Sequence, residues 1–117
     1  MPVFREKNIK TREIFPGVTL TQAVEYDNGS QAVTMGKISI QPGSQIPPHT
    51  HPVDDCMVIL QGNGELYTVE GSVPIEAGCH LSAPANTWHS MGNDGKEDLQ
   101  YVTAHPAVDV TREMKED

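Results

Sequence analysis

Apolar and polar residues alternate with a period of two over much of the chain, which is typical of half-buried β-strands. Val18–Tyr26 places four apolar side chains on one face, with Gln22 as the exception, and Val33–Ile40 ends in the same alternation. Cys56–Leu60 is apolar throughout, as expected for a strand covered on both faces. Further candidate strands are Glu65–Val69, Val73–Ile75, Cys79–Ala83, Thr87–Met91 and Leu99–Thr103.

Short turn sequences separate these strands. Asp27–Gly29, Gly62–Gly64 and Asn93–Gly95 supply residues that adopt the positive φ angles of tight hairpins. Ten glycines and nine prolines are spread along the chain, which argues against long helices. Many short strands at near-even spacing predict an all-β sandwich or small barrel. The last stretch, Val110–Asp117, is compatible with either a short helix or an irregular tail.

The composition narrows the classes of function. A chain of 117 residues with 37% hydrophobic side chains is expected to form one domain with a modest core. The net charge is −8 and no cluster of basic residues occurs, so we expect neither nucleic acid nor an anionic membrane as partner. No apolar run approaches the roughly 20 residues of a membrane-spanning helix. The N-terminus shows no secretory signal, and we therefore expect a cytoplasmic protein.

The candidate chemistry begins at His49 and His51, which leave the same face of the chain if this segment is extended. Two neutral imidazoles on one face can share a cation, although an isolated pair of this kind is more often solvated or structural. Pro52 is expected to end the strand, and a turn then leads to Asp55. A straight strand would separate His51 from Asp55 by about 13 Å, whereas a hairpin brings the carboxylate back across from both histidines.

A second segment can complete this set of side chains. Gly78 opens a strand, a turn follows at Pro84 and Asn86, and His89 lies in the next strand-like piece. If that piece faces the first hairpin, the chain brings together three imidazoles and one carboxylate, which suit a first-row divalent ion.

These residues carry a resemblance to the cupin family, which is marked by the motifs G-x5-H-x-H-x3–4-E-x6-G and G-x5-P-x-G-x2-H-x3-N. The first motif matches the chain from Gly43 to Gly62 and the second from Gly78 to Asn93, with the family spacing throughout. Two residues depart from the pattern. Asp55 stands where the family usually has glutamate, and Asn86 replaces a turn glycine, a mild change because asparagine tolerates left-handed backbone geometry.

The resemblance implies a single cupin domain over residues 1–117, an all-β jelly-roll barrel with a metal inside. It places His49, His51 and His89 on three ligand positions and Asp55 on the fourth. The shorter aspartate either binds directly, binds through water or does not bind, and Asp54 replaces it if the turn shifts by one residue. The cofactor is then one divalent transition metal ion per chain, with zinc, manganese, iron and nickel not distinguished.

The remaining candidate residues receive structural interpretations. We interpret His80 as a surface or hydrogen-bonded residue and His105 as structural. Cys56 and Cys79 are too few for a disulfide framework and are expected as small buried thiols. Trp88 is expected to face away from its neighbour His89. Candidates for the walls of a pocket are Met35, Met57, Met91, Tyr67 and Tyr101.

Two classes of function are consistent with this pattern. The first is a metal-dependent isomerase, lyase or dioxygenase acting on a small oxygen-rich molecule such as a sugar or keto acid, because a three-histidine, one-carboxylate site leaves open positions for substrate oxygens. The second is a non-catalytic module that binds or senses a small molecule, since a fold alone does not determine function. Small cupins commonly dimerise, and we expect a homodimer whose edge strand or exchanged arm comes from Val18–Ile40.

Overall fold

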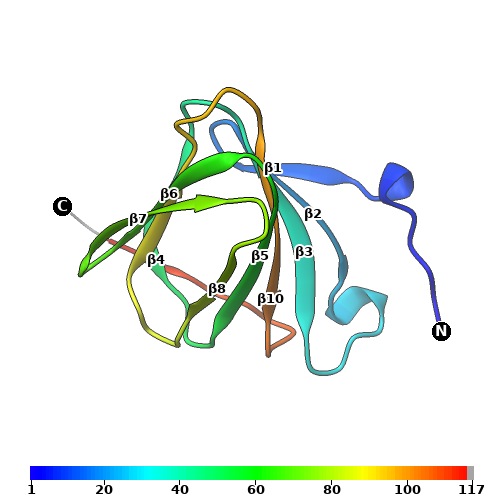
Figure 1. Cartoon of the computed structure of the whole chain (residues 1–117). Helices are drawn as coiled ribbons and strands as arrows, with labels where there is room; N and C mark the ends of the chain where they lie inside the picture. The colour runs from blue at the N-terminus through cyan, green and yellow to red at the C-terminus, as the bar shows by residue number, and fades with distance from the viewer. Residues whose placement is uncertain (116–117) are drawn as a thin grey trace.

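The computed structural model, which describes residues 1–115, consists of two antiparallel β-sheets that face each other (Figure 1). The first sheet has the strand order β1-β2-β3-β10-β5-β8, and the second has the order β11-β4-β9-β6-β7. The strands of the first sheet are β1 (Thr11–Phe15), β2 (Val18–Val24), β3 (Thr34–Ile40), β10 (Leu99–His105), β5 (Asp55–Gln61) and β8 (His80–Ala83). Those of the second are β11 (Glu113–Met114), β4 (Gln45–Thr50), β9 (His89–Gly92), β6 (Asn63–Thr68) and β7 (Gly71–Glu76).

Helical structure among the described residues is confined to two short 3₁₀ turns, η1 (Glu6–Asn8) and η2 (Tyr26–Asn28). No helix within residues 1–115 has the length and hydropathy needed to cross a membrane. The predicted all-β jelly-roll barrel is confirmed, and the predicted strands are all present with shifted ends.

The inward faces of the sheets form the core, and the strand register lines up their apolar side chains. Ile40 lies opposite both Val18 and Leu99, and Ile38 lies opposite both Leu20 and Tyr101. Cross-strand rows of this kind stabilise a sheet because neighbouring side chains pack against each other. The buried core consists of Val18, Leu20, Ile38, Ile40, Ile46, Met57, Ile59, Ile75, Met91, Leu99 and Tyr101.

The barrel has an apolar end and a polar end, as β10 shows. Every second residue of this strand is buried, and the buried series runs from Leu99 and Tyr101 to Thr103 and His105. Leu99 is fully buried in the core, whereas Tyr101 already lines the cavity. The polar members line this cavity at the polar end, which is where the candidate site lies.

Glycines at the motif positions allow the turns that frame this architecture. Gly43, Gly62 and Gly78 have φ angles of 84°, 89° and 96°, which side chains rarely adopt. At Gly62 a Cβ atom would also lie 2.7 Å from the carbonyl oxygen of Asp98. A larger residue at this position would therefore disturb the connection between β5 and β6.

Several expectations from the sequence differ from the structure. Cys56 is exposed because the outer face of β5 is open to solvent and its side chains alternate instead of being covered on both faces. Cys79, just before β8, is half-buried against the core. Within the C-terminal stretch, residues 110–115 contain no helix; they are irregular except for Glu113–Met114, which pairs with β4, and Glu116 and Asp117 lie outside the described residues. Met35 and Tyr67 are 42% exposed and form no wall of the cavity.

Candidate metal centre

The four residues singled out from the motifs meet at one point inside the barrel. His49 lies at the end of β4 and His51 just beyond it, while Asp55 begins β5 and His89 begins β9. All four are buried, and one potential donor atom from each lies within 4.8 Å of the other three. The expected convergence of the two motifs is therefore confirmed, and Asp54 stays outside the cluster.

Local pairing explains why these side chains converge. His49 and His89 are register partners in the ladder between β4 and β9, so both side chains leave the same face. The chain leaves β4 after Thr50 and enters β5 at Asp55, but the two strands belong to different sheets and do not pair, so the predicted hairpin is wrong. The connection crosses the barrel, and Asp55 faces the histidines from the opposite sheet. The backbone N–H of Asn86 donates to the carbonyl of His51 at 2.7 Å, and Asn86 has a φ of 63°. This turn ties the second motif to the first.

Each of the three imidazoles is held by a backbone carbonyl. The Nδ1 atom donates to Pro47 at 2.8 Å in His49, to Thr111 at 2.8 Å in His51 and to Thr87 at 2.9 Å in His89. Because a carbonyl oxygen can only accept a hydrogen bond, Nδ1 carries the proton. The Nε2 atoms are then left with a lone pair directed toward the cluster, the arrangement found in histidines that ligate metals.

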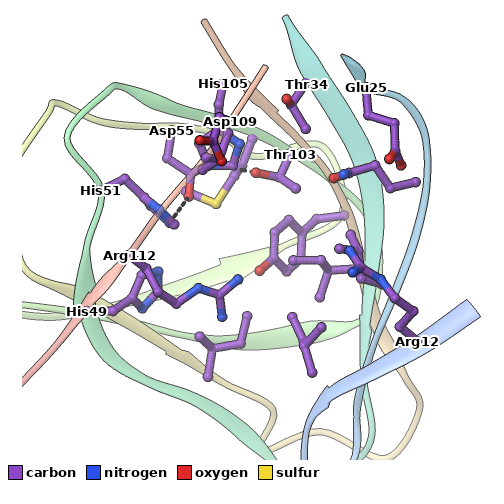
Figure 2. Close-up of a pocket in the computed structure, with 18 of the residues that line it drawn as sticks. Arg12, Glu25, Thr34, His49, His51, Asp55, Thr103, His105, Asp109 and Arg112 are labelled. Atoms are coloured by element: carbon purple, nitrogen blue, oxygen red, sulfur yellow. Dashed lines mark hydrogen bonds and ion pairs between the residues drawn. The ribbon is translucent and has the colours of Figure 1, made fainter. Parts of the chain in front are cut away.

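Asp55 is held from two sides. Its Oδ1 atom accepts a hydrogen bond from the hydroxyl of Thr103 and lies 3.4 Å from Nε2 of His105. Its Oδ2 atom lies 3.5 Å from Nε2 of His89 and 3.7 Å from Nε2 of His51. Figure 2 shows His51, Thr103 and His105 arranged around this carboxylate. One oxygen therefore belongs to a supporting network, and the other faces the histidines.

The environment favours the protonation states that a metal ligand needs in His49, His51 and Asp55, and it acts in the opposite direction at His89. Burial lowers the pKa of His49 to about 4 and lowers the pKa of His51, so both rings are neutral near pH 7. Burial raises the pKa of Asp55, but contacts with His105, His89 and Thr103 outweigh it and hold the pKa well below its usual range. For His89, burial lowers the pKa and contact with Asp55 raises it, with a net increase.

The cluster forms part of the wall of a cavity of about 570 Å³. This volume lies in the range of ligand-binding sites in proteins. Apolar side chains from both sheets form much of the remaining wall: Ile14, Leu20, Ile38, Ile46, Met57 and Met91. The cavity thus combines a polar end with an apolar body.

Several residues of the site were missed or misjudged from the sequence. His105 was interpreted as structural, yet it lines the cavity and contacts Asp55. Its signal was the alternation of β10, which continues beyond Thr103 to His105 and places both side chains on the inward face. Met57, Met91 and Tyr101 do line the cavity as expected, and His80 is exposed as expected. Arg112 and Arg12 also line the cavity, and no sequence pattern marked them.

The fold and this buried cluster together define a small β-barrel protein with a candidate metal site in the wall of its cavity. The family model described as Cupin domain matches residues 36–105, more than half of the chain, and the chain belongs to the cupin family.

Among curated proteins, Auxin-binding protein 1 of Arabidopsis thaliana is 33% identical to the chain over 97 residues, which is 74% of this chain and 49% of that protein. Gentisate 1,2-dioxygenase of a Ralstonia species is 30% identical over 80 residues, which is 68% of this chain and 22% of that protein. The chain spans about half the length, or less, of these curated relatives.

Solved structures resemble the chain over nearly its whole length. The polyketide cyclase RemF from Streptomyces resistomycificus has a TM-score of 0.85 at 15% identity, covering 100% of this chain and 88% of that one. A sugar phosphate isomerase of the cupin superfamily from Silicibacter pomeroyi has a TM-score of 0.84 at 15% identity, covering 99% and 83%. At these identities the likeness shows the fold alone.

Proposed function

We propose that His49, His51, Asp55 and His89 hold one divalent transition metal ion and that the chain is a metal-dependent enzyme acting on a small oxygen-rich molecule. The observation that carries this proposal is the inward orientation of three Nε2 atoms, each fixed by a carbonyl on Nδ1, around one ionised carboxylate. Three imidazoles and a carboxylate form a donor set that suits manganese, iron, nickel or zinc.

An unsatisfied buried atom supports the fit between these residues and a metal ion. Within residues 1–115, Nε2 of His89 makes no hydrogen bond although it is buried, and its 3.5 Å approach to Asp55 is an ion-pair contact without hydrogen-bond geometry. Leaving a polar atom buried without a partner costs about 1–3 kcal/mol. A metal ion coordinated by this nitrogen would remove that cost.

The chain's own residues have separable roles in this proposal. A bound ion supplies a Lewis acid that orients and polarises a substrate oxygen. Thr103 and His105 hold Asp55 in place through its Oδ1 atom. The apolar part of the cavity wall would contact the carbon skeleton of a bound substrate. Substrates with neighbouring oxygens, such as sugars and keto acids, would chelate an ion held here, which suits isomerase, lyase or dioxygenase chemistry.

A second candidate function is a module that binds a small molecule without converting it. The similarity to two auxin-binding proteins, 33% identical over 97 residues and 28% identical over 111 residues, favours this alternative. The proposed metal site serves either function, because a metal ion that orients a substrate can equally hold a ligand. The homodimer and the cytoplasmic location stay predictions from the sequence.

Elemental analysis of protein purified without chelators tests the metal site. We expect about one divalent ion per chain, and an empty site in protein with intact His49 contradicts the proposal. Turnover of a panel of sugars, keto acids and catechols by the metal-loaded protein then separates the two functions. Turnover that is lost on chelation and restored by metal supports the enzyme. Tight binding of a panel member with no turnover supports the binding module.

A further inference from the structure

The segment between β10 and β11 links the candidate metal centre to a second polar group in the cavity. The carbonyl of Thr111 accepts the hydrogen bond from Nδ1 of His51, and β11 pairs directly with the strand that carries His49. Arg112 lies between these two attachment points, and its side chain extends into the cavity (Figure 2). Its position is therefore fixed relative to the histidines by backbone contacts on both sides.

The guanidinium group of Arg112 is held on one face and has free hydrogen-bond donors. Its central carbon lies 5.2 Å from the centre of the Phe15 ring, which is the geometry of a cation–π contact. In the part of the chain that the structure describes, no carboxylate oxygen lies within 4 Å of this group, although four carboxylate side chains line the same cavity. A stacked guanidinium keeps its N–H edges available for an anionic partner.

Tyr101 supplies a second donor in the same cavity. It lies on β10, is 3% exposed and lines the cavity, and its hydroxyl makes no side-chain hydrogen bond within residues 1–115. Burial and the charge of Asp55 raise its pKa, and the positive charge of Arg112 acts in the opposite direction. The phenol therefore keeps its proton near neutral pH and is available to donate it to an anion.

We propose that Arg112 and the hydroxyl of Tyr101 form a subsite for the carboxylate group of a small organic acid. The opposite end of this ligand reaches the candidate metal centre, and its apolar body lies against the wall of the cavity. A planar guanidinium matches the two oxygens of a carboxylate, and the hydroxyl adds a third hydrogen bond. This inference rests on the proposed function, since it assigns the substrate class of the same cavity.

The charges around the cavity favour a monoanion over a phosphate dianion. Two arginines line the cavity together with the carboxylates of Glu25, Asp27, Asp55 and Asp109, and no lysine is among its lining residues within 1–115. Among the side chains, the positive charge is local to the arginines, and the side-chain charges of the cavity are negative in sum when no metal ion is bound. A dianion would meet stronger repulsion from these carboxylates than a carboxylate ligand does.

The test compares a carboxylate with its neutral analogue on the full-length chain. Benzoate and benzamide are titrated by isothermal calorimetry into protein as purified, and again after metal removal with a chelator. We expect benzoate to bind at least about tenfold more tightly than benzamide. We expect R112Q to weaken benzoate binding by about tenfold or more and Y101F by a smaller factor, with benzamide affinity unchanged in both.

Lys115→Gln is the matched control, because it removes a positive charge three residues away that does not line the cavity. The subsite is wrong if wild-type protein binds both compounds equally or neither, or if K115Q loses as much benzoate affinity as R112Q. Competition by inorganic phosphate below the concentration at which benzoate saturates also overturns the carboxylate assignment. R112Q should retain its metal content. Benzoate binding that survives chelation supports the subsite even if the metal proposal fails. If the protein binds metal but does not prefer benzoate to benzamide, the metal proposal stands and the subsite is wrong.

Discussion

The hydroxyl of Thr103 offers a direct test of how the site carboxylate is held. Thr103 is 4% exposed and donates a hydrogen bond to Oδ1 of Asp55, which is itself 6% exposed. Thr103→Val removes this donor while keeping nearly the same side-chain volume. Asp55 has a pKa held well below its usual range, so it stays ionised in the variant and loses one of its few partners.

The expected cost follows from the charge and the burial of the acceptor. A hydrogen bond to a charged group contributes about 1.5–3 kcal/mol to folding stability, and we expect T103V to lose about this much when metal-free. Residues that orient metal ligands typically change metal affinity by about 10- to 100-fold when mutated, and the same loss is expected here. Urea unfolding of chelator-treated protein measures the first effect, and competition with a chromophoric chelator measures the second.

Two further variants make the result interpretable. Thr103→Ser keeps the hydroxyl and should lose only about 0.8 kcal/mol for one buried methyl group, with metal affinity near wild type. Thr21→Val removes an exposed hydroxyl that is paired with Thr11 at 3.1 Å, and it should change stability by less than about 0.5 kcal/mol. If T103V matches wild type in both measurements, Thr103 does not hold Asp55 and the account of the supporting network is wrong.

Three other predictions address the ligands, the pH dependence and the barrel end. His51→Ala should lower the metal content measured by elemental analysis more than His80→Ala does, and equal losses contradict the assignment of ligands. Because burial lowers the pKa of His49 to about 4, the unfolded chain binds a proton there between pH 6.5 and 4 that the folded chain does not. Stability of metal-free protein therefore falls as the pH drops through this window, and denaturation curves of H49Q should show a slope smaller by up to about 1.4 kcal/mol per pH unit. Asn93→Ala removes two donated hydrogen bonds of 2.8 Å and one accepted hydrogen bond of 2.9 Å. Urea unfolding should therefore show a loss of about 2–4 kcal/mol in the free energy of unfolding. The control Asp94→Ala, at an exposed position, should lose less than about 0.5 kcal/mol.

The sequence predicted the parts of the site that depend on local geometry. His49 and His51 share a face because side chains alternate along an extended chain, and the predicted end of the strand near Pro52 agrees with β4 ending at Thr50. Asp55 joins them because the chain crosses to the other sheet, and not through the hairpin that was predicted. His89 was predicted through the spacing of the second motif, and the pairing of β4 with β9 confirms its place. These positions were predictable because they depend on residues that are close in sequence or on a motif of fixed spacing.

The parts that escaped prediction depend on contacts between distant segments. Thr103 and His105 reach Asp55 because β10 inserts between β3 and β5 in the first sheet, and nothing in the alternation of β10 specifies which strands flank it. Arg112 reaches the cavity because the chain crosses from β10 in one sheet to β4 in the other. A period-two pattern predicts which side of a strand is buried, but it leaves the order of strands open.

The apolar run at Cys56–Leu60 illustrates a different limit. Its side chains alternate between buried and exposed positions, and Leu60 remains 51% exposed on the outer face. Hydrophobicity alone therefore suggested a second covering layer that the described chain does not supply. An outer apolar position on a central strand costs little in isolation, since much of the surface of any folded protein is apolar.

Aspartate in place of the usual motif glutamate has a structural counterpart on β10. The side chain of Asp55 is one methylene shorter than that of glutamate, so its carboxylate stays close to the backbone of β5. Thr103 and His105, on the neighbouring strand β10, contact its Oδ1 atom there. These two residues leave Oδ2 facing His51 and His89. Asp55 and the polar pair on β10 therefore act together: Thr103 and His105 fix the carboxylate, and the short side chain of Asp55 keeps it within their reach.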